Sequence, residues 1–548
     1  MTLTEILSAE AGGSRRGILV AASLAGIANA LILFTINSLA HDPSAALVRE
    51  FVIFALLVAL YVHCTRYLTH SAAALLESAL HRIKVRVGER VARAELDAFE
   101  RVKAAEISDR ITQNTSLIAD MAGMLSTMLQ SIPILAFALV YIAWLSLPAF
   151  ALVALLGGIG LVMFLGLRQD FVASVRQSGG IRVTFFERIT DLLSGFKEVK
   201  LSRRRGRELR DDTVQASDAL RAILVQGNQL RSDGNILGES ILFALLAVTV
   251  YTLHAQVALS SLTMTQLVAA VMFTWAPFMG IASGLMPYIR SNLALAEIDA
   301  LEQKLEGVVR VGGASRKAED PWQGKLSTIE AHSVEFAHAA DDGGEAFRIG
   351  PIDFALSSGE VVFIVGGNGS GKSTLLKVLT GLYPARSGTL LVDGVLVGPD
   401  NVAAYRDMIS AIFADFHLFA KLYGLPEVED AAVHGLIARM QLEGKTSFAD
   451  RSFTNIALST GQKKRVAMIV ALLEDRPFCV FDEWAADQDP EFRKYFYDEL
   501  LPLLRQQGKA VLVVSHDDRY FHCADRVVTM EYGKVRSVVA SAPVAVTA

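Results

Sequence analysis

Long apolar runs dominate the first half of the chain, and no comparable run follows residue 288. A helix needs roughly 20 apolar residues to cross a bilayer. The stretches that approach this length are residues 17–40, 46–64, 128–147, 149–167, 236–259 and 265–288. Little more than Pro148 separates the third stretch from the fourth, which suits a tight hairpin at a membrane surface. The pattern predicts an all-α transmembrane domain of six helices within residues 1–306.

The basic residues predict how these helices are oriented. Lysine and arginine are concentrated between the second and third stretches and between the fourth and fifth, whereas the other connections carry none. Because positive residues favour the cytoplasmic side, both termini and everything after residue 306 are expected in the cytoplasm. Arg15 and Arg16 precede the first stretch, but its apolar region is too long for a signal peptide.

The two basic connections carry the periodicity of helices. They are therefore expected to continue the membrane helices into the cytoplasm. Their membrane-distal bends, near residues 102–107 and 207–212, are the candidate contacts with the second half of the chain.

Composition excludes several classes of protein. The chain is 52% hydrophobic, too apolar for an ordinary soluble enzyme. Its net charge of −5 gives no indication of a nucleic-acid partner. The three cysteines, Cys64, Cys479 and Cys523, are too few and too scattered for a disulfide framework or a zinc site. They are expected to be packing residues.

After residue 306 the composition and the expected secondary structure change. Residues 307–324 are polar and dotted with glycine, which predicts a linker, and residues 325–548 alternate short strands and helices. Here GGNGSGKST, residues 366–374, follows the strand-like run VVFIV and opens a helix. This is the context that a phosphate-binding loop requires. The second half is therefore predicted to be an α/β nucleotide-binding domain.

The residue types in this loop suit a nucleotide. Gly366, Gly369 and Gly371 let the backbone curl so that its amides face one point, and the helix N-terminus adds positive potential there. Lys372 can reach the β and γ phosphates, and the Ser373 hydroxyl can ligate Mg²⁺. The predicted ATP-binding residues of the loop are Gly366, Gly367, Asn368, Gly369, Ser370, Gly371, Lys372, Ser373 and Thr374.

Two adjacent acids end an apolar run later in the chain. Residues 478–481 fit a buried parallel strand, and Asp482 and Glu483 follow where nucleotide sites form, beyond the carboxyl ends of strands. Asp482 can hold Mg²⁺ through water, and Glu483 can orient or deprotonate the attacking water. The alternative is a strand that simply ends in solvent with acids at its tip, and the phosphate loop makes this reading weaker.

Two further segments complete the pattern. LSTGQKKR, residues 458–465, has the shape of the ATP-binding-cassette signature LSGGQ, with Thr460 in place of the first central glycine. VLVVSH, residues 511–516, is a buried strand pattern that ends in a histidine. Loop, signature, Asp-Glu pair and histidine, in this order and spacing, resemble an ATP-binding-cassette ATPase. With six spans on the same chain, the whole resembles an exporter half-transporter.

The resemblance implies a homodimer. Each ATP would lie between the phosphate loop of one copy and the signature of the other. The signature residues that would contact ATP in trans are Ser459, Thr460, Gly461 and Gln462.

The resemblance also implies roles for single residues. His516 would sense the γ phosphate beside Glu483, and Asp489 would stand in the D-loop. His338 occupies the position of the family's adenine-stacking aromatic residue. Ala414 stands where most cassettes have a glutamine near Mg²⁺, so water or Asp415 would have to replace that coordination.

The sequence after Glu483 resembles that of a particular subfamily. DEWAADQDP stands where most exporters have DEATSALD, and GPIDF and SHDDRYFHCADR accompany it. These segments resemble the cyclic-peptide exporters of bacteria, which include exporters associated with pyoverdine-type siderophores, syringomycin-type lipopeptides and lasso-peptide microcins. The resemblance implies ATP-driven export of a cyclic or modified peptide across the cytoplasmic (inner) membrane.

Two other functions stay open at this point. The first is an ATP-driven lipid or lipopeptide flippase, which would use the same machinery for another substrate class. The second is a membrane regulator that uses ATP as a switch without transport. The intact Asp482, Glu483 and His516 argue against the regulator.

Overall fold

The computed structural model describes residues 5, 14–41, 47–101, 104–256, 261–306, 320–338, 347–425 and 427–540. The chain divides into two compact units, Met1–Glu89 with Ala104–Gln303 and Arg90–Lys103 with Lys304–Ala548. We call them the helical unit and the α/β unit. Residues 307–319 of the predicted linker lie outside the described residues, as do residue 46 and residues 257–259 of two predicted spans.

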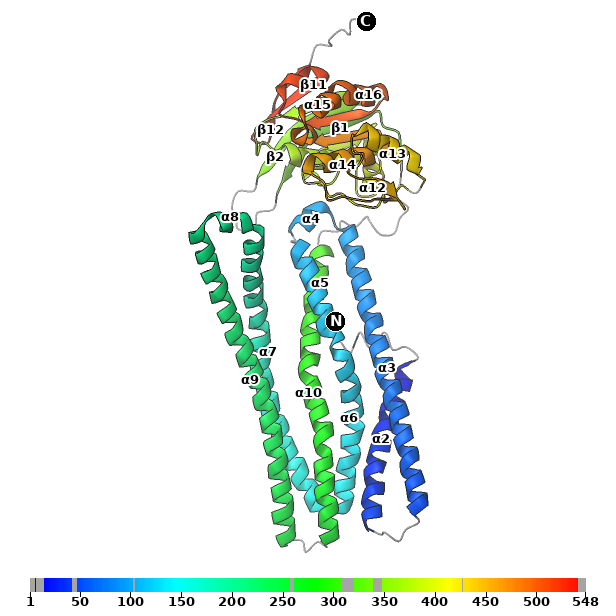
Figure 1. Cartoon of the computed structure of the whole chain (residues 1–548), viewed down its shortest axis with the longest axis vertical. Helices are drawn as coiled ribbons and strands as arrows, with labels where there is room; N and C mark the ends of the chain where they lie inside the picture. Colours follow the sequence, from blue (N-terminus) through cyan, green and yellow to red (C-terminus); the bar gives the residue numbers. More distant parts are fainter. Residues whose placement is uncertain are drawn as a thin grey trace. The chain divides into compact units, whose positions relative to one another are not determined.

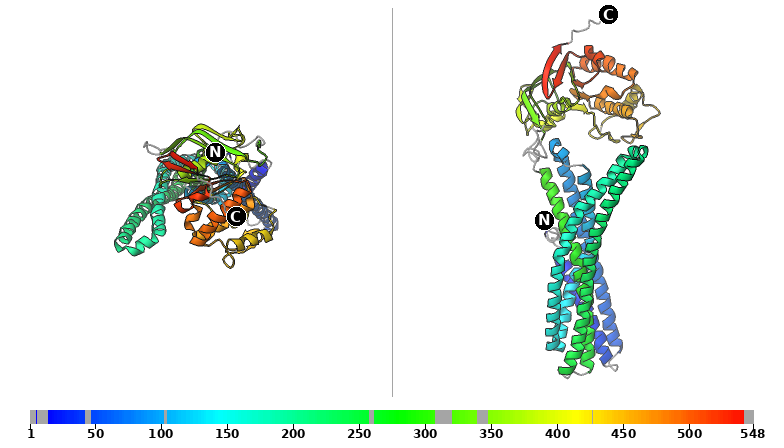
Figure 2. Two further views of the ribbon diagram at one scale, coloured as in Figure 1. Left: turned by 90° about the horizontal axis from the view of Figure 1, so that it is seen from above. Right: turned by 90° about the vertical axis from the view of Figure 1, so that its left-hand side faces the viewer.

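The helical unit is built from long helices joined by short connections (Figure 1). In chain order they are α2 (Ser14–His41), α3 (Leu47–Arg93), α5 (Ala104–Ala119), α6 (Met121–Leu145), α7 (Leu147–Ser194), α8 (Phe196–Leu201), α9 (Arg203–Gln256) and α10 (Ser261–Glu306). Helices α7 and α9 run side by side, and α2 packs along α6. Towards the short helix α8, the α7 and α9 pair diverges from the other helices of this unit (Figure 2).

Apolar segments long enough to cross a membrane lie in most of these helices. Among the described residues, five helices qualify by length and composition: Arg16–Ile36, Val48–Arg93, Ile111–Leu145, Arg203–Tyr251 and Thr263–Leu305. A shorter apolar segment, Leu147–Gly160, lies at the fourth predicted span. Ser146 alone separates α6 from α7, and its hydroxyl accepts a hydrogen bond from the Ala149 N–H (3.4 Å). The predicted all-α membrane domain is confirmed.

Short helices interrupt both basic connections, at α4 (Leu96–Arg101) and at α8. The bend predicted at residues 207–212 is wrong, because these residues lie inside α9. The chain leaves helical conformation instead at Gly195 and Ser202, on either side of α8. Glycine and serine are weaker helix formers than the arginine-rich run that follows. The predicted bend was placed in the charged run, whereas the helix is interrupted at residues of low helix propensity.

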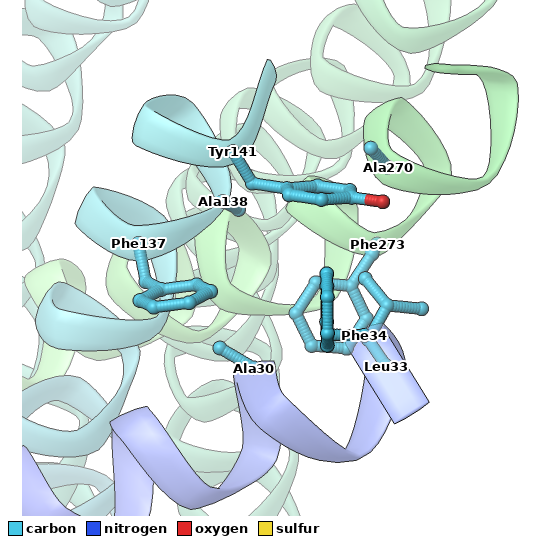
Figure 3. A pocket seen from close by; sticks show the side chains of 8 residues that line it. All are labelled: Ala30, Leu33, Phe34, Phe137, Ala138, Tyr141, Ala270 and Phe273. Carbon is cyan, nitrogen blue, oxygen red and sulfur yellow. The ribbon is translucent and has the colours of Figure 1, made fainter. Parts of the chain in front are cut away.

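A small pocket lies among α2, α6 and α10 (Figure 3). Its lining consists of Ala30, Leu33, Phe34, Phe137, Ala138, Tyr141, Ala270 and Phe273. The Tyr141 hydroxyl is the one polar side-chain group among these lining residues, and the Phe34 and Tyr141 rings meet edge to face with centroids 6.3 Å apart. The pocket offers apolar surface and aromatic rings but no charge.

The described residues of the α/β unit form three sheets, of which the smallest pairs β7 with β8. The six-stranded sheet has the order β12-β11-β3-β10-β9-β6, and the four-stranded antiparallel sheet has the order β2-β1-β4-β5. Strands β11, β3, β10, β9 and β6 are parallel, and β12 is antiparallel to β11. The strands are β1 (Thr328–Ala337), β2 (Arg348–Ser357), β3 (Val361–Val365), β4 (Ser387–Val392), β5 (Val395–Leu396), β6 (Ile409–Ile412), β7 (Phe448–Ala449), β8 (Ser452–Phe453), β9 (Phe478–Asp482), β10 (Ala510–Val514), β11 (Arg526–Glu531) and β12 (Lys534–Ala540).

Helices and turns connect these strands. They are α11 (Lys372–Leu379), α12 (Val402–Arg406), α13 (Asp430–Arg439), α14 (Thr460–Glu474), η1 (Trp484–Asp487), α15 (Pro490–Tyr495), η2 (Phe496–Leu500), α16 (Leu501–Gln506) and η3 (Asp518–Cys523). Side chains of β3 alternate between two cores, with Val362 and Ile364 in one and Val361 and Phe363 in the other. A parallel strand covered on both faces needs such a continuous apolar run. The run VVFIV is therefore explained by burial on both faces.

Candidate functional site

Three adjacent parallel strands end at one edge of the six-stranded sheet. Val514 of β10 pairs with Ile364 of β3 on one side and with Asp482 of β9 on the other. Because these strands are parallel and in register, the segments that follow them are neighbours. The phosphate loop follows β3, Glu483 follows β9, and His516 comes shortly after β10. The carboxyl edge of a parallel sheet is where α/β proteins place ligand sites.

The phosphate loop has a backbone that requires glycine and holds a lysine inside it. Gly371 has a φ of 99°, and a Cβ there would lie 2.7 Å from Ile349 Cγ2. Lys372 opens α11, is buried, and donates from Nζ to the carbonyls of Gly366 (2.9 Å) and Gly367 (3.0 Å). Burial lowers the pKa of Lys372, while the carboxylates at the end of β9 oppose that shift. The ammonium thus lies against the carbonyls of the loop.

The rest of the loop presents polar groups. Ser370 is buried, its N–H donates to the Gly367 carbonyl (3.2 Å), and its hydroxyl has no partner in the described part of the chain. The exposed or half-buried loop residues include Gly367, Asn368, Gly369, Ser373 and Thr374. Exposed amides at a helix N-terminus form a natural anion site. The loop therefore has the groups that a phosphate chain requires.

Asp482 is 2% exposed, and its Oδ1 has no hydrogen-bond partner among the described residues. Burial is the largest influence on the pKa of this carboxyl group, and the Ser373 side chain and the Ala414 main chain act in the opposite direction. Burial raises the pKa of Asp482 above its ordinary value. A free buried carboxylate oxygen beside a hydroxyl is an oxygen donor set that suits Mg²⁺. Ala414, which lacks a side chain able to bind, contributes here through its main chain.

Glu483 occupies a left-handed backbone conformation with a φ of 51°, which is uncommon outside glycine. Its N–H donates to the Val514 carbonyl (3.1 Å), and its own carbonyl accepts from Lys464 Nζ (2.7 Å). Its Oε1 lies 3.1 Å from His516 Nε2. The turn therefore brings the Glu483 carboxylate to the end of β10, where it meets the histidine.

The signature segment begins helix α14 with a reciprocal cap. The Ser459 hydroxyl accepts from the Gln462 N–H (3.4 Å), and the Gln462 side chain accepts from the Ser459 N–H (3.2 Å). A Cβ on Gly461 would lie 2.5 Å from the Asp487 carbonyl oxygen, so this position has no room for a side chain. Ser459 and Thr460 are exposed. The N-terminal end of α14 is thus rigid and open to solvent.

Comparison with known proteins decides the family. The ABC transporter family matches residues 349–486. The ATP-binding protein SyrD of Pseudomonas syringae pv. syringae is 31% identical over 468 residues, which is 83% of this chain and 82% of SyrD. The chain belongs to the ABC transporter family. It is a multi-pass membrane protein whose ATP-binding domain couples ATP hydrolysis to transport.

Other similar proteins match either one part of the transporter or its whole fold. The energy-coupling factor transporter ATP-binding protein EcfA1 of Oenococcus oeni is 32% identical over 197 residues, 34% of this chain and 70% of EcfA1. The solved structure of a bacterial Atm1-family ABC exporter with ATP bound is 16% identical, with a TM-score of 0.78 over 98% of this chain and 95% of that chain. The transporter therefore has the fold of an ABC exporter.

Residues without a role in the sequence interpretation fix the acidic turn of the transporter to its signature helix. Trp484 is 0% exposed, its Nε1 donates to the Lys464 carbonyl (2.8 Å), and its ring packs on Phe496 with centroids 4.7 Å apart. Lys464 is also buried and pairs with Asp487 (2.7 Å). The signal that pointed to them was a tryptophan in an acid-rich segment, since such a large ring is rarely left in solvent. The segment after Glu483 is thus a structural link.

A second link joins the signature helix to the predicted D-loop. Arg465 Nε donates to Gln488 Oε1 (2.9 Å), and Gln488 Nε2 donates to the Gly461 carbonyl (3.1 Å). Arg465 also forms an ion pair with Asp489, which caps α15 by accepting from the Phe492 N–H (2.9 Å). This backbone hydrogen bond and the Arg465 charge lower the pKa of Asp489. The predicted D-loop acid is thus engaged within its own chain.

His338 lies directly after β1, in an aromatic cluster. Its ring meets Phe336 and Tyr383 edge-on, with centroid separations of 5.2 Å and 5.7 Å. Phe336 and Tyr383 stack at 4.6 Å. The imidazole is therefore held by two neighbouring rings, an arrangement that suits packing against a flat base.

The α4 segment of the transporter belongs to the α/β unit and contacts it through charged residues. Glu100 pairs with Lys377 of α11 (2.7 Å) and accepts a hydrogen bond from the Tyr383 hydroxyl. Glu95 pairs with Arg406 of α12 (2.6 Å). The bend predicted at residues 102–107 lies just beyond these contacts, and residues 102–103 are outside the described residues. The helix that starts at the phosphate loop is thereby tied to a connection between membrane helices.

Proposed function

We propose that this transporter exports a cyclic or modified peptide, such as a peptidic siderophore or its precursor, a lipopeptide or a peptide antibiotic, across the bacterial cytoplasmic membrane. The observation that carries the proposal is the extent of the likeness to SyrD. The 468 aligned residues outnumber the residues of the α/β unit, so the alignment must include much of the helical unit. The helical unit is the part that would contact the transported molecule. The 197 residues shared with EcfA1 are few enough to lie within one unit. The segments GPIDF, DEWAADQDP and SHDDRYFHCADR support the peptide as substrate.

The membrane orientation is part of the proposal. Both termini and the α/β unit lie in the cytoplasm, because the basic residues are concentrated in the two connections that continue the helices on that side. ATP is then available to the phosphate loop, and the peptide leaves on the opposite side.

We assign hydrolysis to the groups at the carboxyl edge of the six-stranded sheet. Glu483 orients or deprotonates the attacking water, and the His516 Nε2–H, 3.1 Å from Glu483 Oε1, keeps that carboxylate aligned and faces the γ phosphate. Lys372 and the amides of residues 366–374 hold the phosphate chain. His338 packs against the adenine. The phosphate loop, Glu483 and His516 follow three adjacent strands, so the fold positions them before ATP binds.

Asp482 and Ser373 would hold Mg²⁺. The fit rests on the partnerless buried Oδ1 of Asp482 and on its contact with the Ser373 hydroxyl. A bound Mg²⁺ neutralises charge on the phosphate oxygens. The Ala414 main chain lies near enough to the Asp482 carboxyl group to favour its ionised form.

We propose that the working unit is a homodimer. The amides and side chains of Ser459, Thr460, Gly461 and Gln462 would meet the ATP held by the other copy, because they form an exposed, rigidly capped helix N-terminus. Helix α8 buries none of its residues, and its Leu201 is 89% exposed. Large apolar side chains at the end of an extended hairpin suit an interface with a second copy.

Coupling between ATP and transport follows from linkage. ATP shifts a conformational equilibrium only if it binds one state better than the other. A site shared between two copies meets this condition, since only the closed dimer brings a signature to each phosphate loop. The α4 contacts through Glu100 and Glu95 would carry the change to the membrane helices.

Transport can be tested with the purified full-length protein in liposomes. Inside-out vesicles would be given ATP and a labelled cyclic lipopeptide, a linear peptide of the same composition, or a fluorescent phospholipid. We expect uptake of the cyclic peptide with ATP and none with the E483Q variant. Movement of phospholipid alone would overturn the peptide as substrate and favour the flippase.

The shared site can be tested by complementation. The K372A variant damages the phosphate loop and the S459R variant damages the signature, so each should be inactive alone. If the signature acts in trans, a mixed dimer contains one intact site, and co-expression should restore part of the ATP turnover. No restoration, with mixed dimers present, would show that the signature acts within its own chain.

A further inference from the structure

Three side chains of types that bind metals meet on the surface of the α/β unit, and none of them belongs to the hydrolysis groups at the sheet edge. Asp498 comes from the turn η2, and His522 and Cys523 come from η3. One donor atom from each lies within 4.8 Å of the other two. Cys523 Sγ is 3.4 Å from His522 Nε2 and 3.9 Å from Asp498 Oδ1. The roles proposed above for ATP and transport use none of these three residues.

Packing beneath the cluster holds the two segments together. The rings of Tyr497 in η2 and Tyr520 in η3 stack with centroids 4.2 Å apart and planes 13° from parallel. The Tyr497 hydroxyl lies 2.7 Å from Ser515 Oγ, and both groups are buried. The three donors therefore stand on a rigid base, which a metal site requires in order to bind with fixed geometry.

The two separations from Cys523 Sγ are close to the edges of a tetrahedral site. With metal–sulfur and metal–nitrogen distances of roughly 2.3 and 2.0 Å, tetrahedral geometry places the two donor atoms about 3.5 Å apart. The observed separations of 3.4 Å and 3.9 Å are close to that value. Thiolate and imidazole favour zinc and similar transition metals, whereas Mg²⁺ prefers oxygen donors. A surface cluster held only by hydrogen bonds would not require a thiol, an imidazole and a carboxylate together.

We propose that Asp498, His522 and Cys523 form a binding site for a divalent transition metal of the Zn²⁺ type, with water as the fourth ligand. Cys523 binds as the thiolate, so each ion bound releases the Cys523 thiol proton to solvent. The Asp498 carboxylate and this thiolate together balance the two positive charges of the ion. Asp498 and His522 are exposed, so the site is open to ions from solution.

Occupancy would join two segments that flank the hydrolysis site. Helix η3 begins two residues after His516, and η2 follows the helix capped by Asp489. A metal that bridges η2 and η3 adds a cross-link to the Tyr497 and Tyr520 stack. We expect the backbone amides of residues 496–500 and 518–523 to exchange more slowly when the metal is bound.

The test uses the full-length protein, reduced and purified through a tag without histidine. Co²⁺ serves as the probe, because a bound thiolate gives a sulfur-to-cobalt charge-transfer absorption. We expect one Co²⁺ per chain with this absorption, displacement by Zn²⁺, and slower amide exchange in the two segments. The C523S variant should lose the absorption, and H522Q should bind Co²⁺ about tenfold more weakly or worse, since it removes one of three ligands.

Matched controls separate this site from other cysteines and histidines. Cys479 is a buried thiol in β9, and His332 is an exposed histidine beside Glu330. The C479S and H332Q variants should bind Co²⁺ like the unmodified protein. The proposal fails if the charge-transfer absorption persists in C523S, or if H522Q and D498N bind as tightly as the unmodified chain. It also fails if no absorption appears although circular dichroism shows the protein folded.

Discussion

The α/β unit and the helical unit use buried polar side chains in opposite ways. At the sheet edge of the α/β unit, the charged groups of Lys372, Asp482 and Glu483 are gathered where a ligand can reach them. In the helical unit, buried hydroxyls such as those of Thr115, Ser126 and Ser178 donate to carbonyls one turn earlier in their own helix. The charged groups at the sheet edge are placed for chemistry, whereas these three hydroxyls of the helical unit are satisfied within their own helices.

The difference has a physical origin. Hydrolysis requires charged groups that are already positioned around the phosphates. A domain surrounded by water can hold such charged side chains. An ionised group within the bilayer is costly, so a transport surface relies on shape and apolar contact. No charged residue lines the pocket around Phe34 and Tyr141. The residue types at the sheet edge therefore identify the hydrolysis site, whereas apolar residue types in a transport surface do not identify the substrate.

The largest effect is expected when one charge is removed from the sheet edge. We expect the E483Q variant to lose about 100- to 10,000-fold in ATP turnover, because a general base contributes that much, while ATP still binds. Phosphate release and binding of a fluorescent nucleotide would measure the two effects. The E491Q variant, an exposed acid in the first turn of α15, is the control and should hydrolyse normally. Near-normal turnover in E483Q would contradict the assignment.

The next effect concerns packing behind the acids. We expect the W484A variant to lose about 3–5 kcal/mol of stability in the α/β unit, because it removes a fully buried ring. Hydrogen exchange of the strands β9 and β10 in the full-length protein would measure it. The W484F variant keeps an aromatic ring but loses the hydrogen bond to the Lys464 carbonyl. The loss of stability in W484F should be smaller than in W484A. Equal losses would show that the hydrogen bond contributes more stability than the packing of the ring.

A smaller effect is expected from an ion pair of the helical unit in which one partner is buried. Arg86 of α3 donates to Glu302 of α10 over 2.8 Å, and Glu302 is buried. We expect the R86M variant to lose about 1–2 kcal/mol, because a charged hydrogen bond to a buried carboxylate is lost and Arg86 is partly exposed. Amide exchange in α3 and α10 is the readout. The R204M variant breaks an exposed pair with Glu208 and should change little.

The smallest effect has the opposite sign. The pKa of Asp482 is raised by burial, so its ionised form destabilises the nucleotide-free and metal-free protein. This cost is absent below the unfolded-state pKa near 3.9 and is complete above the raised pKa. We expect D482N to be about 1 kcal/mol more stable at neutral pH, because one unpaired buried oxygen becomes neutral, while it loses Mg²⁺-dependent hydrolysis. Thermal unfolding from pH 4 to 8 is the measurement, and a gain that shrinks as pH rises would refute the explanation.

Much of the fold and of the hydrolysis site could be predicted from local pattern. The apolar runs, the glycines of residues 366–374 and the Asp482 and Glu483 pair each reflect a requirement met within a few neighbouring residues. The bend after α7 could not be placed, because charge marks the solvated face of a helix and not its end. The breaks at Gly195 and Ser202 depend on backbone preferences that the charged run obscured.

Apolar spanning helices, a phosphate loop and the motif order of an ABC ATPase can be recognised in the sequence alone. Those features depend on periodicity and on obligatory residue types. The contacts between residues far apart in the chain emerge only from the folded structure. It pairs Trp484 with Lys464, brings the Ala414 amide to Asp482, and places Cys523 beside Asp498. Such contacts follow from strand register and helix packing, which join residues that no spacing along the chain relates.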